Sequence, residues 1–426
     1  MFHQGLSHPL PAGLRDLLAE ETFYRRSLAR RVLEHFALHA YDLVTPPAFE
    51  LAEVLEKGLG TLDPGDVLRF VEPESGEVCA LRPDMTPQIA RMVATRLSSQ
   101  PAPIRLCYEG TIVRRRQGRA RRHRQVHQAG VELHGAPAPR GDEEVLRLLA
   151  SVSRSVGLES FVIDLGHAGI SRSLVDVLPA GLAGEITDAL VHKDRARVVA
   201  LLSTNAGAGV PGPVARALEA LPGLSGGFTG RSGAAVLKEA EEVFRGTPAE
   251  RPLDEIAGLW QRIGGDSGGL RIDLGEVRHF AYYTGIIFHA IAPGPGEPYA
   301  SGGRYDDLLG RFGHPMAAVG FAMHLDAVAR AREAAGVVEN RPVRVLVAMN
   351  SGGDEVARRL RGEGIAAAEA NVNDALRYSR AHGYTHVVRD ADVGYVQVDN
   401  LRGPGASKIV RADGITDWVR TEMKGR

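Results

Sequence analysis

The chain has 426 residues, a formal net charge of −1 and two cysteines, and hydrophobic residues make up 44% of it. This length predicts two or three domains, and the balanced charge excludes a general attraction to nucleic acid or to membranes. Cys79 and Cys107 lie in apolar stretches without metal-ligand spacing, which indicates buried thiols in a reducing compartment. No signal-peptide pattern and no window of about 18 uninterrupted apolar residues is present, so we expect a cytoplasmic protein without a membrane segment.

The first third of the chain predicts helices that flank an antiparallel sheet, an α+β fold. Amphipathic spacing indicates a helix from residue 13 to 39 and a second from 51 to 59. Two strands joined by a turn at residues 73–76 follow, and then a helix over 87–97. The next stretches, IRLCYEGTIVR and QVHQAGVELHG, are typical of strands, with an arginine-rich loop between them.

The middle of the chain changes to helical segments, such as SLVDVLPAGL and AVLKEAEEVF, separated by glycine-rich turns. Strand patterns return at GLRIDLGEV and YYTGIIFHAIAP, and PMAAVGFAMHLDAVARA predicts a buried strand that runs through Gly320 into an amphipathic helix. Alternating strands and helices after residue 342 predict a small α/β domain. The predicted domains are the first part of a core, 1–169, a helical insertion, 170–264, the second part of the core, 265–335, and the small domain, 342–426.

The sequence lacks the common catalytic fingerprints. It contains no G-x-x-x-x-G-K-[ST], no H-E-x-x-H and no nucleophile elbow, so we expect neither a metal nor a cofactor. Several polar residues nevertheless interrupt apolar strands. Burying a charge is costly unless it is paired, so these residues either pair with one another, as Asp84 and Arg82 would, or face a polar ligand. The polar residues in question are Asp84, Gln128, Glu132, Arg278, Tyr282 and Tyr283.

Five stretches of the chain resemble the catalytic core of histidyl-tRNA synthetase, in order over residues 8–330. They are LPAGLRDLLAEE, LRPDMTPQIAR, RLCYEGTIVRR with RQVHQAGVELHG, YYTGIIF, and SGGRYDDLLGRFGHPMAAVGFAMHLD. Within that superfamily they are most similar to the regulatory subunits of ATP phosphoribosyltransferase. The resemblance implies a class II synthetase fold, with an antiparallel sheet flanked by helices, a self-dimer built on the N-terminal region and a helical insertion.

Three departures separate this chain from the synthetase motifs, two of them at the nucleotide site and one in the histidine motif. Where the last motif carries an arginine that binds ATP phosphates, this chain has Ala327. In the F-R-x-E motif Arg114 is retained but Arg116 replaces the glutamate, and the histidine motif R-G-L-D-Y-Y becomes RHFAYY, with Ala281 in place of the aspartate. Adenylate formation needs an oriented and charge-neutralised triphosphate, so we expect no catalytic activity. The stretch GFAMHLDAV is interpreted as the wall of a former ATP site, kept for packing.

The amino-acid pocket implied by the resemblance is better preserved. Asp84 would meet the ligand ammonium, Arg278 would face the carboxylate or the space beyond it, and the two tyrosines would line the imidazole. The implied histidine-binding residues are Asp84, Thr86, Arg114, Gln128, Glu132, Arg278, Tyr282 and Tyr283. The implied function is a non-catalytic regulatory subunit that a short-form ATP phosphoribosyltransferase requires for the first step of histidine biosynthesis. It would form a hetero-oligomer with that catalytic subunit and mediate feedback inhibition by free histidine.

Other interpretations stay open. The loop RRRQGRARRHR carries seven arginines, which suits phosphates or nucleic acid and suits equally a solvated loop or a docking surface for an acidic partner. We expect Arg114 and Arg124 to face inward and the other arginines to be exposed. Residues 342–411 resemble a shortened anticodon-binding domain but are not notably basic, so nucleic acid is not an expected partner. The alternatives are a histidyl-tRNA synthetase with degenerate motifs and a histidine-binding protein with an unrelated partner.

Overall fold

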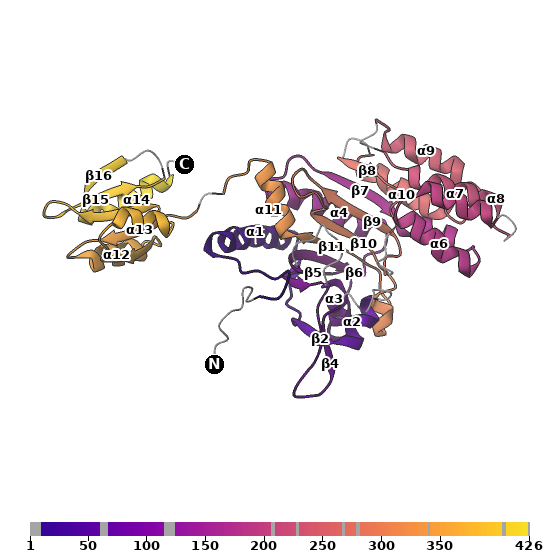
Figure 1. Cartoon of the computed structure of the whole chain (residues 1–426), viewed down its shortest axis with the longest axis horizontal. Helices are drawn as coiled ribbons and strands as arrows, with labels where there is room; N and C mark the ends of the chain where they lie inside the picture. Colours follow the sequence, from indigo (N-terminus) through magenta and orange to yellow (C-terminus); the bar gives the residue numbers. More distant parts are fainter. Residues whose placement is uncertain are drawn as a thin grey trace. The chain divides into compact units, whose positions relative to one another are not determined.

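The computed structural model describes residues 10–59, 67–114, 124–205, 209–226, 230–265, 269–277, 282–339, 341–402 and 406–424. The chain forms two compact units, Met1–Val338 (unit 1) and Glu339–Arg426 (unit 2) (Figure 1). Among the described residues no helix is both long enough and apolar enough to cross a bilayer.

Unit 1 is built on an eight-stranded sheet with the order β1-β5-β6-β11-β10-β9-β7-β8. The five central pairs are antiparallel, whereas the edge pairs, β1 with β5 and β7 with β8, are parallel. The α+β class predicted from the sequence is confirmed. The strands are β1 Asp42–Leu43, β5 Ile104–Val113, β6 Gln125–His134, β7 Val162–His167, β8 Leu270–Ile272, β9 Ile286–Ile291, β10 Ala300–Arg304 and β11 Ala318–His324.

Three helices, α1 (Ala19–Leu38), α4 (Arg140–Ser155) and α11 (Leu325–Ala334), pack on one face of this sheet. Leu28, Val32 and Phe36 of α1 are buried because residues four apart share one face of a helix. The prediction that this helix begins at residue 13 is wrong. Leu18, placed on its apolar side, is an extended N-cap residue with a side chain that is 76% exposed.

The opposite face of the sheet is covered by α3 (Thr86–Met92), which continues as a π-helical turn, η2 (Val93–Leu97). The predicted two-stranded hairpin is present and joins a third strand in a small sheet of order β2-β4-β3. A short 3₁₀ turn, η5, follows β10 and also contacts α3. These elements are β2 Phe49–Leu51, α2 Ala52–Leu59, β3 Arg69–Val71, β4 Val78–Leu81 and η5 Leu309–Phe312.

Helices occupy the described chain between β7 and β8 (Figure 1). The helical segment expected over residues 173–182 is instead two helices. Pro179 separates them, because a proline is tolerated at the start of a helix but not within it. The helices are α5 Ala168–Val175, α6 Ala180–Val191, α7 Arg195–Thr204, α8 Gly212–Ala220, η3 Leu221–Gly223, α9 Gly233–Phe244 and α10 Glu250–Arg262. We call α5–α10 the helical insertion, and its limits at residues 170 and 264 remain a proposal.

Unit 2 has a five-stranded sheet of order β13-β12-β14-β15-β16, in which the first three strands are parallel and the last two antiparallel to their neighbours. Its own apolar core is rich in valine. Our sequence analysis did not predict the last helix, although Ile415, Trp418 and Val419 have helical spacing. The elements are β12 Arg344–Ala348, α12 Gly353–Gly362, β13 Ala366–Glu369, α13 Ala375–Ala381, β14 His386–Asp390, β15 Tyr395–Asn400, β16 Ala406–Arg411, η6 Ala412–Gly414 and α14 Ile415–Lys424.

Candidate functional site

The candidate site lies on the sheet face that α3 covers. In the sheet register Glu132 of β6 pairs with Gly320 of β11, which pairs with Gly303 of β10. Paired residues on neighbouring strands point to the same face, so the Glu132 carboxylate lies over two glycines. A Cβ at Gly320 would overlap Oε2 of Glu132, and a Cβ at Gly303 would lie 2.8 Å from the ring of Tyr283. The two glycines therefore leave room on the sheet for a carboxylate and an aromatic ring.

Glu132 is 1% exposed, and two hydroxyl groups bind its carboxylate. Thr86, the first residue of α3, donates from Oγ1 to Oε1 at 2.6 Å, and the hydroxyl of Tyr305 donates to Oε2. Burial raises the pKa of Glu132 well above its usual value, and the nearby Asp84 raises this pKa further. Among the described residues no cation pairs with Glu132. A buried carboxylate in such surroundings favours a bound cation.

Asp84 supplies the second carboxylate of the site and is 6% exposed. Its Oδ1 accepts a hydrogen bond from the backbone N–H of Met85 at 2.8 Å, and its Oδ2 accepts one from the hydroxyl of Tyr282 at 3.0 Å. The alternative in which Arg82 neutralises Asp84 is wrong, because that guanidinium donates to backbone carbonyls instead. These acceptors are the carbonyl oxygens of Thr111, Pro46 and Pro47, at 2.8, 3.0 and 3.3 Å.

Three tyrosines form an aromatic wall beside the two carboxylates. The ring centroids of Tyr282 and Tyr283 are 4.8 Å apart, and those of Tyr282 and Tyr305 are 5.9 Å apart at an interplanar angle of 85°. Burial, and then the charge of Asp84, raise the pKa of Tyr282 well above its usual value. Its hydroxyl therefore stays protonated and donates to Asp84. The three rings offer flat apolar surface beside the two carboxyl groups.

Gln128 lies on the same face of β6, two same-face positions before Glu132. Its side chain is 1% exposed, and within the described chain its Oε1 is buried without a hydrogen-bond partner. Leaving a buried acceptor unsatisfied costs about 1–3 kcal/mol. The amide oxygen is therefore available to an N–H group of a ligand.

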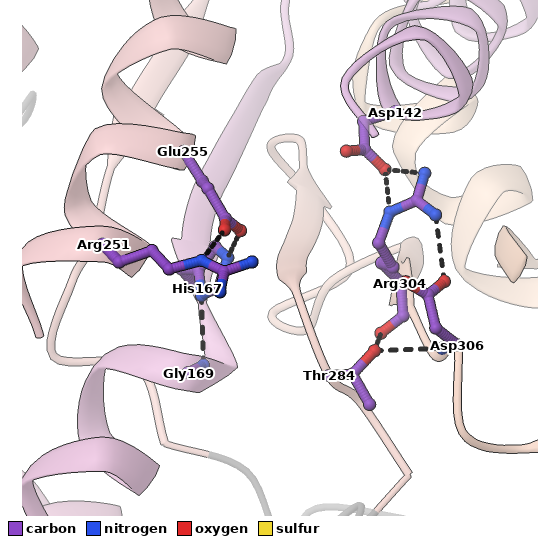
Figure 2. A network of polar contacts seen from close by, with 8 residues as sticks. All are labelled: Asp142, His167, Gly169, Arg251, Glu255, Thr284, Arg304 and Asp306. Carbon is purple, nitrogen blue, oxygen red and sulfur yellow. Dashed lines mark hydrogen bonds and ion pairs between the residues drawn. The ribbon is translucent and has the colours of Figure 1, made fainter. Parts of the chain in front are cut away.

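A buried ion pair fixes the segment that carries the tyrosines. Arg304, 3% exposed, donates from Nε to Asp142 Oδ1 at 2.8 Å and from Nη1 to Asp306 Oδ1 at 3.0 Å (Figure 2). Its backbone carbonyl accepts the N–H of Thr284 at 2.7 Å, and the Thr284 hydroxyl accepts the N–H of Asp306 at 2.9 Å. The segment Tyr282–Gly285 is thus tied to the end of β10, which itself is held by α4 through Asp142.

The basic residues proposed for the site are only partly described. Arg114 is half-buried, and its Nε donates to the backbone carbonyl of Pro83 at 2.7 Å, directly before Asp84. Arg124 is also half-buried, and its Nε donates to the Arg114 carbonyl at 3.4 Å. Arg278 and Ala281 lie outside the described residues, as do Arg116 and the rest of the arginine-rich loop, 115–123.

The stretch GFAMHLDAV forms the end of β11 and the start of α11, as predicted. Ala327 is 1% exposed and belongs to the core between α11, α1 and the sheet. Its place in that core agrees with a stretch kept for packing. The described part of the chain contains no group of three His, Cys, Asp or Glu side chains suited to a metal ion.

Comparisons with known proteins show the family to which the chain belongs. Residues 13–328 match the family model described as histidyl-tRNA synthetase. The ATP phosphoribosyltransferase regulatory subunit of Anaeromyxobacter sp. strain K is 42% identical over 329 residues, which are 76% of this chain and 91% of that protein. The chain belongs to the ATP phosphoribosyltransferase regulatory subunit family. A further member of this family, from Geobacter sulfurreducens, is 34% identical over 397 residues, covering 89% of this chain and 88% of its own length.

Solved structures show the same architecture. An ATP phosphoribosyltransferase regulatory subunit/histidyl-tRNA synthetase from Bacillus halodurans superposes with a TM-score of 0.75 at 26% identity, covering 91% of this chain and 99% of its own. Histidyl-tRNA synthetase from Nostoc sp. PCC 7120 superposes with a TM-score of 0.77 at 18% identity, covering 98% of this chain and 100% of its own, which shows the shared fold.

In this family member the structure brings together most of the predicted histidine-binding set. Hydrogen bonds join Thr86 to Glu132 and Tyr282 to Asp84, and the ring of Tyr283 lies beside that of Tyr282. Gln128 lies on the same sheet face as Glu132. The sequence analysis missed Tyr305, the second hydroxyl partner of Glu132, and Arg304. Both stand in SGGRYDDL, where a charged residue directly after a glycine pair at the end of an apolar strand was the available signal.

Proposed function

We propose that this chain acts as the regulatory subunit of a hetero-oligomeric ATP phosphoribosyltransferase, with a separate short catalytic subunit that carries out the first step of histidine biosynthesis. The observation that carries the proposal is 42% identity over 91% of a relative of that name. The chain is a non-catalytic subunit in this assignment. The apolar, buried position of Ala327, where a synthetase has a phosphate-binding arginine, supports it.

The same proposal assigns free histidine to the pocket between Asp84 and Glu132. Two buried carboxylates without a cationic partner in the described chain suit the ligand ammonium. The unpaired Oε1 of Gln128 suits an imidazole N–H, and the rings of Tyr282 and Tyr283 suit its flat face. Arg114, and Arg278 by resemblance alone, would supply the positive charge for the ligand carboxylate.

Three further features complete the proposal, of which only the self-dimer comes from the resemblance to class II synthetases. We propose that two copies of the chain form a self-dimer through the N-terminal region, and that this dimer binds the catalytic subunit. A cytoplasmic site of action remains a prediction. The two buried free cysteines, Cys79 and Cys107, suit a reducing compartment.

The test combines reconstitution with calorimetry. Co-expression with a short catalytic subunit should give a stable complex whose phosphoribosyltransferase activity exceeds that of either protein alone and falls when histidine is added. Histidine should bind the isolated chain, and Asp84→Asn or Glu132→Gln should weaken binding about 10- to 100-fold, since a hydrogen bond to a charged group contributes about 1.5–3 kcal/mol.

A matched control is Glu109→Gln. Glu109 lies on β5, next to the strand of Glu132, but pairs with His127. Its substitution should leave histidine affinity unchanged. Equal effects of the Glu109 and Glu132 variants would remove Glu132 from the binding site, and failure to form a complex would contradict the regulatory assignment.

A further inference from the structure

The helical insertion contacts the pocket segment Tyr282–Gly285 directly. Arg172, on α5, donates from Nη2 to the backbone carbonyl of Tyr283 at 2.8 Å. The ring of the same tyrosine lies against Gly303 in the candidate site. Tyr283 is therefore shared, because its ring belongs to the pocket while its backbone is held by the insertion.

The insertion also holds the chain that leads into residues 278–281. The backbone N–H of Leu274 donates to the carbonyl of Leu224 at 2.9 Å. Lys193, in the turn between α6 and α7, binds Asp273 Oδ2 at 2.5 Å. Lys193 has a left-handed backbone (φ 52°), which costs about 1–2 kcal/mol for a residue with a side chain, so this turn is held in place by such contacts. Both flanks of the segment that carries Arg278 are thus bound to the insertion.

The insertion and the core leave a cavity between these attachments. A cavity of about 220 Å³ lies there, with Val175 of α5 and Leu190 of α6 on one side and Val277 and Ile287 on the other. Around this cavity the two parts still touch, because α5 contacts β9 and the backbone N–H of Ala168, the first residue of α5, donates to the carbonyl of Gly285 at 2.9 Å. Arg172 adds a side-chain contact to Tyr283 farther along α5.

At its beginning α5 is tied to another helix of the insertion. His167, the N-cap residue, accepts the N–H of Gly169 at its Nδ1 at 3.1 Å, and its Nε2 pairs with Glu255 Oε2 of α10 at 3.3 Å (Figure 2). Arg251 donates to the other carboxylate oxygen of Glu255 at 3.0 Å. Because His167 is also the last residue of β7, the start of α5 and the middle of α10 are both held at the end of that strand.

We propose that Arg172 is a positioning residue that couples occupancy of the pocket to the order of the helical insertion. The inference rests on the proposed binding of histidine. A ligand that fixes the rings of Tyr282 and Tyr283 also fixes the carbonyl that Arg172 holds, and so restrains α5 to α7. Coupling between two sites is reciprocal, so a contact that orders the insertion raises histidine affinity by the same factor.

Hydrogen–deuterium exchange of the full chain, with and without saturating histidine, tests this coupling. In the unaltered protein histidine should slow exchange both in the pocket strand β6 and in residues 180–204, which do not contribute to the pocket. In Arg172→Met the slowing in β6 should persist while that in 180–204 is lost. Histidine affinity, measured by calorimetry, should fall about 5-fold or more, the lower end of typical couplings. Arg172→Lys keeps a cationic donor and should restore part of both effects.

Arg231→Met is the matched control, because Arg231 is also an exposed arginine of the insertion but pairs with Glu239. It should leave both readouts unchanged. If the unaltered protein binds histidine but 180–204 is not protected, or is protected equally in Arg172→Met, the coupling is refuted and the proposed function stands. If the unaltered protein does not bind histidine, the proposed effector and this inference both fail.

Discussion

Replacing Glu132 by glutamine should make the ligand-free protein more stable while weakening its response to histidine. The desolvation penalty of a buried ion is several kcal/mol, and the hydroxyls of Thr86 and Tyr305 recover about 1.5–3 kcal/mol each. Glutamine has almost the same shape and keeps an acceptor for Thr86, at about 1 kcal/mol, without the charge penalty. We expect Glu132→Gln to raise the free energy of unfolding by about 1–3 kcal/mol at pH 8.

The gain in the free energy of unfolding of Glu132→Gln should depend on pH. The folded pKa of Glu132 lies above the unfolded value of 4.5, so its penalty is absent below pH 4.5, where both states are protonated. The penalty grows as pH rises through the folded pKa, and the advantage of glutamine should therefore vanish at pH 4 and be largest at pH 8. Glu109→Gln is the opposite case, because the hydrogen bond from His127 lowers the pKa of Glu109, and this variant should lose stability at pH 8.

Urea unfolding followed by tryptophan fluorescence measures both effects. The chain has two tryptophans, Trp260 in unit 1 and Trp418 in unit 2, so a Trp418→Phe background reports on unit 1 alone. Histidine at 100 times its dissociation constant should stabilise this reference protein by about 2.7 kcal/mol, and the same concentration should stabilise Glu132→Gln by only about 0.4–1.4 kcal/mol. A glutamine variant that is less stable at pH 8, yet is stabilised by histidine as much as the reference, would refute this account of the pocket.

Three further changes have directions set by the structure. Burial lowers the pKa of His134 to about 3 from 6.5, so neutral His134 contributes fully to stability above pH 6.5 and this contribution is lost as pH falls towards 3. Between pH 7 and pH 4.5 the unaltered protein should therefore lose about 2.7 kcal/mol more free energy of unfolding in urea than His134→Phe, and equal losses would contradict this. Gly320→Ala should lower the melting temperature and histidine affinity, because its Cβ overlaps the Glu132 carboxylate, and an unchanged variant would disprove that overlap. The unaltered protein should show no histidine-dependent ATP–pyrophosphate exchange, and robust exchange would establish a synthetase instead. Ala327→Arg should lower the melting temperature without producing exchange, because position 327 is buried in the core.

Patterns of hydrophobicity predicted the elements that carry the site better than they predicted its contacts. The strands β5 and β6, and the passage from β11 into α11, follow from local periodicity, and Asp84, Gln128 and Glu132 stood out because they interrupt apolar runs. Partners distant in the sequence could not be read in this way. Arg304 binds Asp142, 162 residues away, and Tyr305 binds Glu132, 173 residues away.

Local signals also failed where they competed with one another. Leu17 and Leu18 continue the apolar spacing of α1, but the helix begins only at Ala19. A glycine with φ +83° at position 13 turns the chain instead. The pairing of Asp84 with Arg82 was plausible from their spacing alone. The structure shows that the arginine donates to backbone carbonyls, so Asp84 instead accepts hydrogen bonds from Met85 and Tyr282.

Removing unit 2 should leave the regulatory function intact. Unit 1 ends at Val338 and has its own cores, while unit 2 has a separate core of its own. The Anaeromyxobacter relative is matched over 91% of its length by only 329 residues of this chain, about the length of unit 1, whereas the Geobacter relative is matched by 397. The match to the Anaeromyxobacter relative thus leaves about as many residues of this chain uncovered as unit 2 contains. A chain of residues 1–338 should bind histidine with the affinity of the full chain and activate the catalytic subunit to a similar extent in the reconstituted assay. Loss of activation with histidine binding retained would instead assign contact with the catalytic subunit to unit 2.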